Sequence, residues 1–416
     1  MTVDHEPGVR WAQVLHFYQP PLQTHEILAR VVEESYRPLH DVLLGFRGAR
    51  VANHMNAVLA EALHDHGYED VLASLRLLGE RGQAEFLGGA RFHPILPLLT
   101  PAERRRAIAE NDAANRRLLG GGWAPKGFFP PELALTPSIL PEISAAGHSW
   151  VLASGIAAPD QWPVDHVPVA KAGSRPVSVL FRDDARSNRI SFRQLTAADW
   201  VRELSALAPS DGRSYVVTAM DAETFGHHIA GWEREFLAAC YGLLADPGRV
   251  HVRMVQPSEV VAQFPAGPLV EPRSSSWSTS NEDIAAGNPL PLWNAPGNRI
   301  HRLQWEYVAL VREMLARAEQ AVSNPESQRY AKLAGEVYQP ALHSCQFWWA
   351  SHRPWWEPFM IQRGLGLLTQ ALLFAAHAAQ LGQIDDETRR EIRWSLAAAN
   401  DTREQLERLL FSGNQP

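Results

Sequence analysis

Acidic and imidazole side chains lie within or just past four apolar, strand-like runs of this 416-residue chain. They are His16, Glu85, Glu132 and Asp221. In a parallel barrel, polar side chains at the carboxyl ends of the strands form the active site. Two carboxyl groups on separate strand ends suit glycosidic cleavage, in which one acid protonates the leaving oxygen and another group attacks the sugar or directs water. The pattern therefore indicates chemistry on carbohydrates.

The two carboxylates with the clearest setting are Glu132 and Asp221. Two phenylalanines and two prolines precede Glu132 and make a rigid approach to it. Asp221 ends the apolar run 215–220, but Glu223 competes for the same role and local sequence does not separate them. The plainer interpretations are a surface glutamate at a turn and a helix N-cap. The distance between the two catalytic carboxyl groups is ~5 to 5.5 Å in retaining enzymes and roughly 6.5 to 9.5 Å in inverting ones, and the sequence does not give it.

The first 260 residues alternate strand-like runs with amphipathic helical patterns, such as 26–44, 56–78 and 102–119. This alternation predicts a parallel sheet, and about seven repeats favour a closed or nearly closed (β/α) barrel. The expected strands are 9–17, 84–87, 127–129, 150–153, 177–182, 215–220 and 250–255.

The sequence pattern changes at two points along the chain. We expect a barrel over residues 1–265 and an aromatic active-site loop over 266–300, where Pro, Gly, Ser and Asn abound. A helical region over 301–416 follows. Its expected helices are 300–321, 328–343, 358–381 and 386–410, rich in Ala, Leu, Arg and Glu.

Composition excludes several other classes of protein. The net charge of -7 argues against nucleic-acid binding, which needs a basic surface. Residues 1–11 show no secretory signal, and the apolar run 365–381 is too short and too polar for a membrane span. Two cysteines allow no disulfide framework. We therefore expect a cytoplasmic protein with no nucleic-acid or membrane partner, whose oligomeric state is open.

Several catalytic motifs are absent. The sequence has no phosphate-binding GxxxxGK loop, no GxSxG nucleophile elbow and no GxGxxG after a strand-like run. None of the 17 histidines has another histidine three or four residues away, so no helix presents two imidazoles to one metal. We expect no metal, although a site assembled from distant residues stays open.

Four ordered motifs resemble glycoside hydrolase family 57 over about residues 9–360. They are a His-Gln-Pro segment, a Gly-x-x-Glu segment, a Pro-Glu segment with aromatics, and an Asp followed by Glu-x-Phe-Gly. Here they read HFYQP from His16, GQAE ending at Glu85, FPPE ending at Glu132, and DAETFG from Asp221. The resemblance implies an incomplete (β/α)7 TIM-like barrel with a C-terminal helical region, acting on α-glucans without a cofactor.

By the same resemblance, Glu132 is the nucleophile and Asp221 the general acid/base of a retaining double displacement. His16 and Glu85 bind the sugar next to the broken bond. We also expect Gln19 and His228, which accompany His16 and Asp221 in their motifs, to bind substrate. The leading hypothesis is a retaining glycoside hydrolase or transglycosylase that takes α-1,4-linked glucan or maltooligosaccharides.

Two departures from the family pattern keep alternatives open. Phe17 and Tyr18 are inserted in the first motif, and the fifth motif reads SCQFWW from Ser344, so its usual aspartate is replaced. The alternatives are a catalytically weak glucan-binding barrel, an α-glucan branching enzyme and a metal-dependent carbohydrate deacetylase. The last needs an aspartate and two imidazoles around a divalent ion.

Seven of the 14 tryptophans fall between residues 277 and 356. Indole faces stack on sugar rings, so we expect Trp277 and Trp348 to contact substrate, and place Trp277 and Trp293 in a loop able to cover the barrel mouth. A tryptophan-rich core is the competing interpretation, and it is the expected one for Trp305, on an otherwise amphipathic helix.

Overall fold

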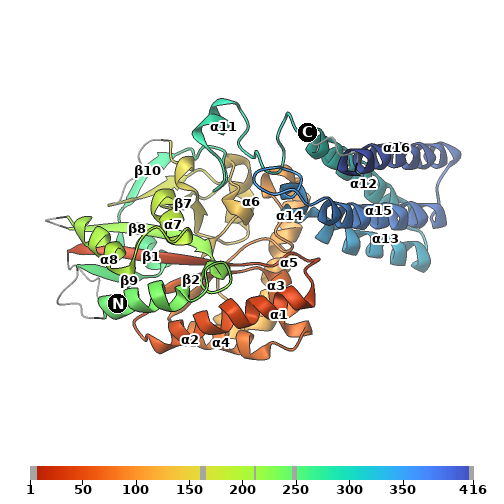
Figure 1. Ribbon diagram of the computed structural model, residues 1–416. Helices are drawn as coiled ribbons and strands as arrows, with labels where there is room; N and C mark the ends of the chain where they lie inside the picture. The colour runs from red at the N-terminus through yellow and green to blue at the C-terminus, as the bar shows by residue number, and fades with distance from the viewer. Residues whose placement is uncertain (1–6, 160–164, 210–211, 246–250, 412–416) are drawn as a thin grey trace. The chain divides into compact units, whose positions relative to one another are not determined.

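The computed structural model describes residues 7–159, 165–209, 212–245 and 251–411 (Figure 1). The chain forms two compact units, Met1–Trp277 and Ser278–Pro416. The boundary between the units falls inside residues 266–300, where we expected an aromatic loop. That segment also contains a strand, β10 (Ala266–Val270), and a short helix, α11 (Asn281–Ala285).

The first unit is built on two sheets. One has the order β3-β2-β1-β8, with β9 also paired to β1, and all its pairs are parallel. The other has the order β10-β6-β7-β5-β4, and only its β6–β7 pair is antiparallel. The strands are β1 Gly8–Phe17, β2 Val51–Met55, β3 Ala84–Leu87, β4 Gly127–Phe128, β5 Trp150–Ala153, β6 Val167–Ala170, β7 Val177–Phe181, β8 Arg213–Asp221 and β9 Val252–Val255.

Backbone contacts join the two sheets at both sides of the first one, beyond β3 and at β8. Gly88, just past β3, forms a parallel bridge with Phe128 of β4. The amide of Asp183, just past β7, donates to the carbonyl of Val217 on β8 at 2.8 Å. The result is a half-barrel of mainly parallel strands. The predicted α/β class is confirmed, and the count of seven repeats stays a prediction.

The helices of this unit lie between the strands in sequence, and Figure 1 shows α1 to α4 beside β1 and β2. The expected helix 26–44 contains a π-helical turn, and the expected helix 56–78 is two helices. The elements are α1 His25–Val31, η1 Val32–Tyr36 (π-helical), α2 Arg37–Gly45, α3 Ala57–Asp65, α4 Glu69–Glu80, α5 Pro101–Leu119, α6 Leu140–Ala145, α7 Asp184–Ser191, α8 Ala197–Ala206, η8 Glu233–Ala238 (π-helical), α9 Ala239–Leu244 and α10 Pro257–Gln263.

Strand β1 shows how alternation separates two hydrophobic cores. Trp11, Leu15 and Phe17 pack in a core formed with the surrounding helices. Ala12 and Val14 point the other way, into a core shared with other strands. Since side chains alternate along a strand, His16 lies on the same face as Ala12 and Val14, at the carboxyl end of the strand.

The second unit is helical, as predicted. Its helices are α11, α12 Arg299–Ala321, α13 Pro325–Tyr338, α14 Ser344–Trp348, α15 Pro358–Leu381 and α16 Asp386–Phe411. Helix α15 is long and apolar enough to cross a membrane by length and composition alone. It packs against α12, α13 and α16. Its alanines and Leu365, Leu368 and Leu372 are buried, whereas Leu373 is exposed.

Candidate active site

The carboxyl ends of β1, β2 and β8 bring three of the site's side chains together. Register pairs His16 of β1 with Asp221 of β8 and with His54 of β2. The His16 ring stacks on Phe129, which follows β4, with centroids 4.8 Å apart and planes 8° apart. The Nδ1 atoms of His16 and His54 lie 2.7 Å apart. Strand ends from both sheets therefore meet at His16.

Glu132 lies in a one-turn 3-10 helix, Pro131–Leu133, with a left-handed backbone (φ 59°). Such a φ is costly for a residue with a Cβ and occurs where the surrounding structure imposes it. Two hydrogen bonds from Trp277 hold Glu132 in this place. The Trp277 amide donates to the Glu132 carbonyl at 3.1 Å, and its indole N–H donates to Glu132 Oε2 at 2.9 Å. The direction of this carboxylate is therefore fixed.

The other carboxylate oxygen of Glu132, Oε1, lies 3.6 Å from Nδ1 of His93. His93 is buried, and it too has a left-handed backbone (φ 55°). Its ring stacks on Tyr18 at 4.0 Å and on His16 at 4.8 Å. Glu132 is thus bordered by an indole donor and an imidazole.

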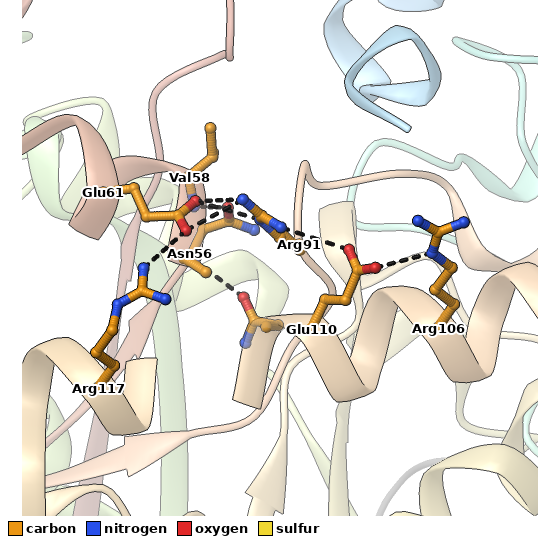
Figure 2. A network of polar contacts seen from close by, with 9 residues as sticks. Asn56, Val58, Glu61, Arg91, Arg106, Glu110 and Arg117 are labelled. Atoms are coloured by element: carbon orange, nitrogen blue, oxygen red, sulfur yellow. Dashed lines mark hydrogen bonds and ion pairs between the residues drawn. The ribbon is translucent and has the colours of Figure 1, made fainter. Parts of the chain in front are cut away.

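The segment that carries His93 is held by an ion-pair network (Figure 2). Arg91 donates from one guanidinium nitrogen to both carboxylate oxygens of Glu61, at 2.9 and 3.1 Å, and contacts Glu110 at 3.5 Å. The side-chain amide of Asn56 donates to the backbone carbonyl of Ala90, at 2.8 Å. These bonds tie the chain leading to His93 to α3 and α5.

The imidazoles of His16 and His54 are buried in this stack. Burial lowers the pKa of His16 to about 3, and burial together with the nearby His16 lowers the pKa of His54 well below its ordinary value. Both rings are therefore neutral at physiological pH. Neutral imidazoles can donate to, or accept from, a sugar hydroxyl without adding charge.

Asp221 ends β8 and stays partly exposed. Its surroundings raise the pKa of the carboxyl to about 6 by desolvation, and the charge of Arg182 opposes this shift. Arg182 is buried just past β7, where it bonds the carbonyl of Ala219 at 2.8 Å and lies 5.9 Å from the Trp277 ring centre. Arg182 thus links the surroundings of Asp221 to Trp277, the residue that holds Glu132.

Glu223, the competitor of Asp221, is buried and hydrogen-bonded. Its Oε1 accepts from the hydroxyl of Tyr36 and from the amide of Gln19, the latter at 3.1 Å. Burial and the charge of Asp221 raise the pKa of Glu223 to about 8. Because Asp221 is the more exposed of the two acids, geometry favours it as the group that meets a substrate.

The other predicted site residues are held by contacts of their own. Glu85 accepts from the backbone amide of Ser258 at the start of α10, at 2.9 Å, so its carboxylate is held against that helix. His228 is exposed, and its amide donates to the carbonyl of Glu223. Trp348 is half-buried in α14 of the second unit.

Two other tryptophans of the second unit are packed against neighbouring residues. Trp293, expected in a loop able to cover the barrel mouth, lies in a turn between α11 and α12 and is 1% exposed, and its place over the barrel mouth stays a prediction. Trp305 packs within the unit, as expected, because its ring stacks on Phe347 at 4.4 Å and its indole donates to the carbonyl of Trp293.

Sequence reasoning missed His54, His93, Tyr36 and Arg182. Arg182 ends a predicted strand, so its position was a usable signal. The strand carrying His54 reads VANHM, too polar to be recognised, although its residues are buried. His93 and Tyr36 reach the site through a left-handed turn and a π-helical turn, which leave no periodic signal.

Distant histidines do meet, but without the geometry of a metal site. His16, His54 and His93 come from separate segments: the His16 ring stacks on both of the others with centres 4.8 Å apart, and the His54 and His93 rings are tilted with centres 6.4 Å apart. Within the described ranges, no group of three or more His, Cys, Asp or Glu side chains is arranged to hold a metal ion.

Comparison with known proteins supplies a family. Residues 5–271 match the glycosyl hydrolase family 57 model. The chain is 23% identical to an α-amylase of Pyrococcus horikoshii over 74% of this chain and 47% of that protein. It is 24% identical to a 4-α-glucanotransferase of Thermococcus kodakarensis over 65% of this chain and 42% of that protein. It therefore spans less than half the length of these curated relatives.

Among solved structures, the fold resembles a family 57 branching enzyme of Thermococcus kodakaraensis. The TM-score is 0.67 at 15% identity, and the match covers 94% of both chains. This likeness concerns the fold, whereas the family match rests on sequence over more than half of the chain. The chain belongs to glycosyl hydrolase family 57.

Proposed function

We propose that the protein is a retaining glycoside hydrolase or transglycosylase acting on α-1,4-linked glucan. Glu132 is the nucleophile and Asp221 the general acid/base. The observation that carries the proposal is that these two acids follow strands of different sheets yet are connected through Trp277. Trp277 bonds Glu132, and its ring lies beside His16 and Arg182, the two residues next to Asp221. The names of the relatives, an α-amylase and a 4-α-glucanotransferase, support an α-glucan substrate.

Each acid is suited to one part of the double displacement. Asp221, with its raised pKa, gives its proton to the glycosidic oxygen while Glu132 attacks the anomeric carbon and forms a glycosyl ester. Asp221, now ionised, then removes a proton from an incoming hydroxyl as that oxygen displaces Glu132. Water gives hydrolysis, and a glucan hydroxyl gives transfer.

Substitution of Glu132 tests the proposal. We expect Glu132→Gln to lower turnover of maltoheptaose by roughly 10⁴-fold or more while the fold is kept. Azide should restore turnover to Glu132→Gly and yield a glycosyl azide, because it replaces the missing nucleophile. The exposed Glu80, at the end of α4, provides a matched control, and Glu80→Gln should keep full turnover.

Product analysis separates the alternatives. Retention predicts that the first product released from maltoheptaose has the α configuration by proton NMR, and a β product would contradict the roles given. New reducing ends indicate hydrolysis, whereas new α-1,6 signals on amylose indicate branching. Binding of maltooligosaccharides with no product over days would support the glucan-binding alternative. Acetate release that a chelator abolishes would support the deacetylase.

A further inference from the structure

A π-helical turn, η1 (Val32–Tyr36), contacts the segment that carries the proposed acid/base. Its last three residues each reach that segment. Glu34 pairs with His227 at 2.6 Å, Ser35 donates to the carbonyl of Ala222 at 3.1 Å, and the hydroxyl of Tyr36 donates to Glu223. π-helical turns are rare and often occur at functional sites.

The contact between the turn and this segment is close enough to require a glycine. A Cβ added to Gly226 would lie 1.8 Å from the carbonyl oxygen of Glu34, and the φ of Gly226 is 110°. Only glycine fits such a backbone without strain. The turn and the segment 221–227 therefore have one relative position, which fixes the Tyr36 hydroxyl beside Glu223.

Tyr36 is fully buried, and its ring lies 5.5 Å from that of Phe17. Gln19 is the second donor to the same Glu223 oxygen, at 3.1 Å. Both donors stabilise the ionised form of Glu223. They oppose burial and the charge of Asp221, which together favour the protonated form.

Asp221 and Glu223 therefore form a coupled pair, with Arg182 as the nearby cation and Tyr36 as the neighbouring phenol. His16, opposite Asp221 in the strand register, is neutral, because burial lowers its pKa to about 3. Over an intermediate pH range the pair holds one proton, and most of it resides on Glu223, because the pKa of Glu223, about 8, exceeds that of Asp221, about 6. Only a proton on Asp221, the partly exposed member, can reach a leaving oxygen.

We propose that Tyr36 is a positioning residue of this pair: its hydroxyl favours ionised Glu223 and so raises the share of the proton that resides on Asp221. The inference rests on the proposed role of Asp221. It assigns the π-helical turn a part in the reaction, since the turn presents the phenol to Glu223.

The variant Tyr36→Phe tests this role because it keeps the ring and removes only the donor. Glu223 then retains the shared proton more strongly, so a smaller share of it resides on Asp221. We expect kcat/KM on maltoheptaose to be kept at about pH 5, where both acids are protonated, and to fall by up to about tenfold between pH 6 and 8, so that the alkaline limb is displaced toward acid. Tenfold is the size expected for loss of a hydrogen bond to a carboxylate. Tyr68→Phe, which removes a hydroxyl that contacts His25 on the helical side, should leave the limb in place.

The leaving group gives a second measurement. An α-maltosyl fluoride needs little proton donation, so Tyr36→Phe should lower its cleavage less than that of maltoheptaose at the same pH. An equal loss on both substrates at every pH, with the limb unmoved, would overturn the inference and leave Tyr36 a structural residue. An unchanged profile would overturn it too.

A variant that keeps the phenol is a control for effects of misfolding. Replacing Tyr36 by 3-fluorotyrosine gives a more acidic, stronger donor of nearly the same shape, and it should move the limb the other way, toward alkaline pH. Asp221→Asn separates the two proposals. If that variant keeps full turnover, the proposed function is wrong. If it is inactive while both Tyr36 variants titrate like the wild type, only the role of Tyr36 is wrong.

Discussion

At the scale of single residues, Trp277 holds Glu132 through two hydrogen bonds, one from its backbone amide and one from its indole N–H. We expect Trp277→Phe to lower kcat on maltoheptaose by about 10-fold or more, because a hydrogen bond to a charged group is worth about 1.5 to 3 kcal/mol. Steady-state kinetics with a thermal melt would measure this.

A matched control is Trp11→Phe. It also removes an indole donor, but Trp11 lies on the helix-facing side of β1 and its indole bonds Thr218 of β8, at 2.9 Å. That variant should lose stability and keep kcat per folded molecule. Equal kcat in the two variants would show that the indole bond of Trp277 has no part in placing Glu132.

The two buried acids Asp221 and Glu223 also make the stability of the fold depend on pH. Their pKa values are raised to about 6 and about 8, so ionisation is harder in the folded state and stability falls as pH rises from about 4 through these values. Asp221→Asn and Glu223→Gln should therefore raise Tm at pH 8 by roughly 2 to 4 °C or more, and change it little at pH 4, where the native acids are protonated. Melting scans at both pH values would measure this, and a lower Tm at pH 8 would contradict it.

At the scale of elements, the segment leading to His93 depends on the Arg91 network (Figure 2). Arg91→Met would leave Glu61 and Glu110 without their shared cation. We expect it to cost about 1 to 3 kcal/mol of stability and to lower kcat by about 10-fold, because His93 shifts against Glu132. Urea unfolding and steady-state kinetics would measure the two effects.

Arg106 offers a control within the same network. It pairs with Glu110 one helical turn away and is about half exposed, so Arg106→Met should cost less than about 0.5 kcal/mol and keep kcat. If Arg91→Met lowered stability but kept kcat, the network would serve only the fold.

Elements with a strong periodic signal were predictable from the sequence. Strands β3 and β5 and helix α15 begin and end at the predicted residues. The capping pair Thr100 and Glu103 marks the start of α5, because each side chain bonds the other's backbone amide. Strand β2 was missed, because buried Asn53 and His54 hide its alternation.

At the scale of the molecule, the chain divides at residues 277 and 278, and the family match, residues 5–271, lies almost wholly in the first unit. The residues of the candidate site, from His16 to Trp277, all belong to that unit. Trp348 and the replaced fifth motif belong to the second unit. Sugar contact by Trp348 remains a prediction.

Short stretches of sequence were enough to predict the alternation of strands and helices, the helical second unit, and Glu132 and Asp221 as candidate acids. These follow from local patterns, because apolar periodicity and the residues at strand ends are written in short stretches of chain. The tertiary structure alone decided which groups surround the acids. Tyr36 meets Glu223 across 187 residues and Trp277 meets Glu132 across 145. Contacts at such separations arise from strand pairing and chain turns, which no local pattern encodes.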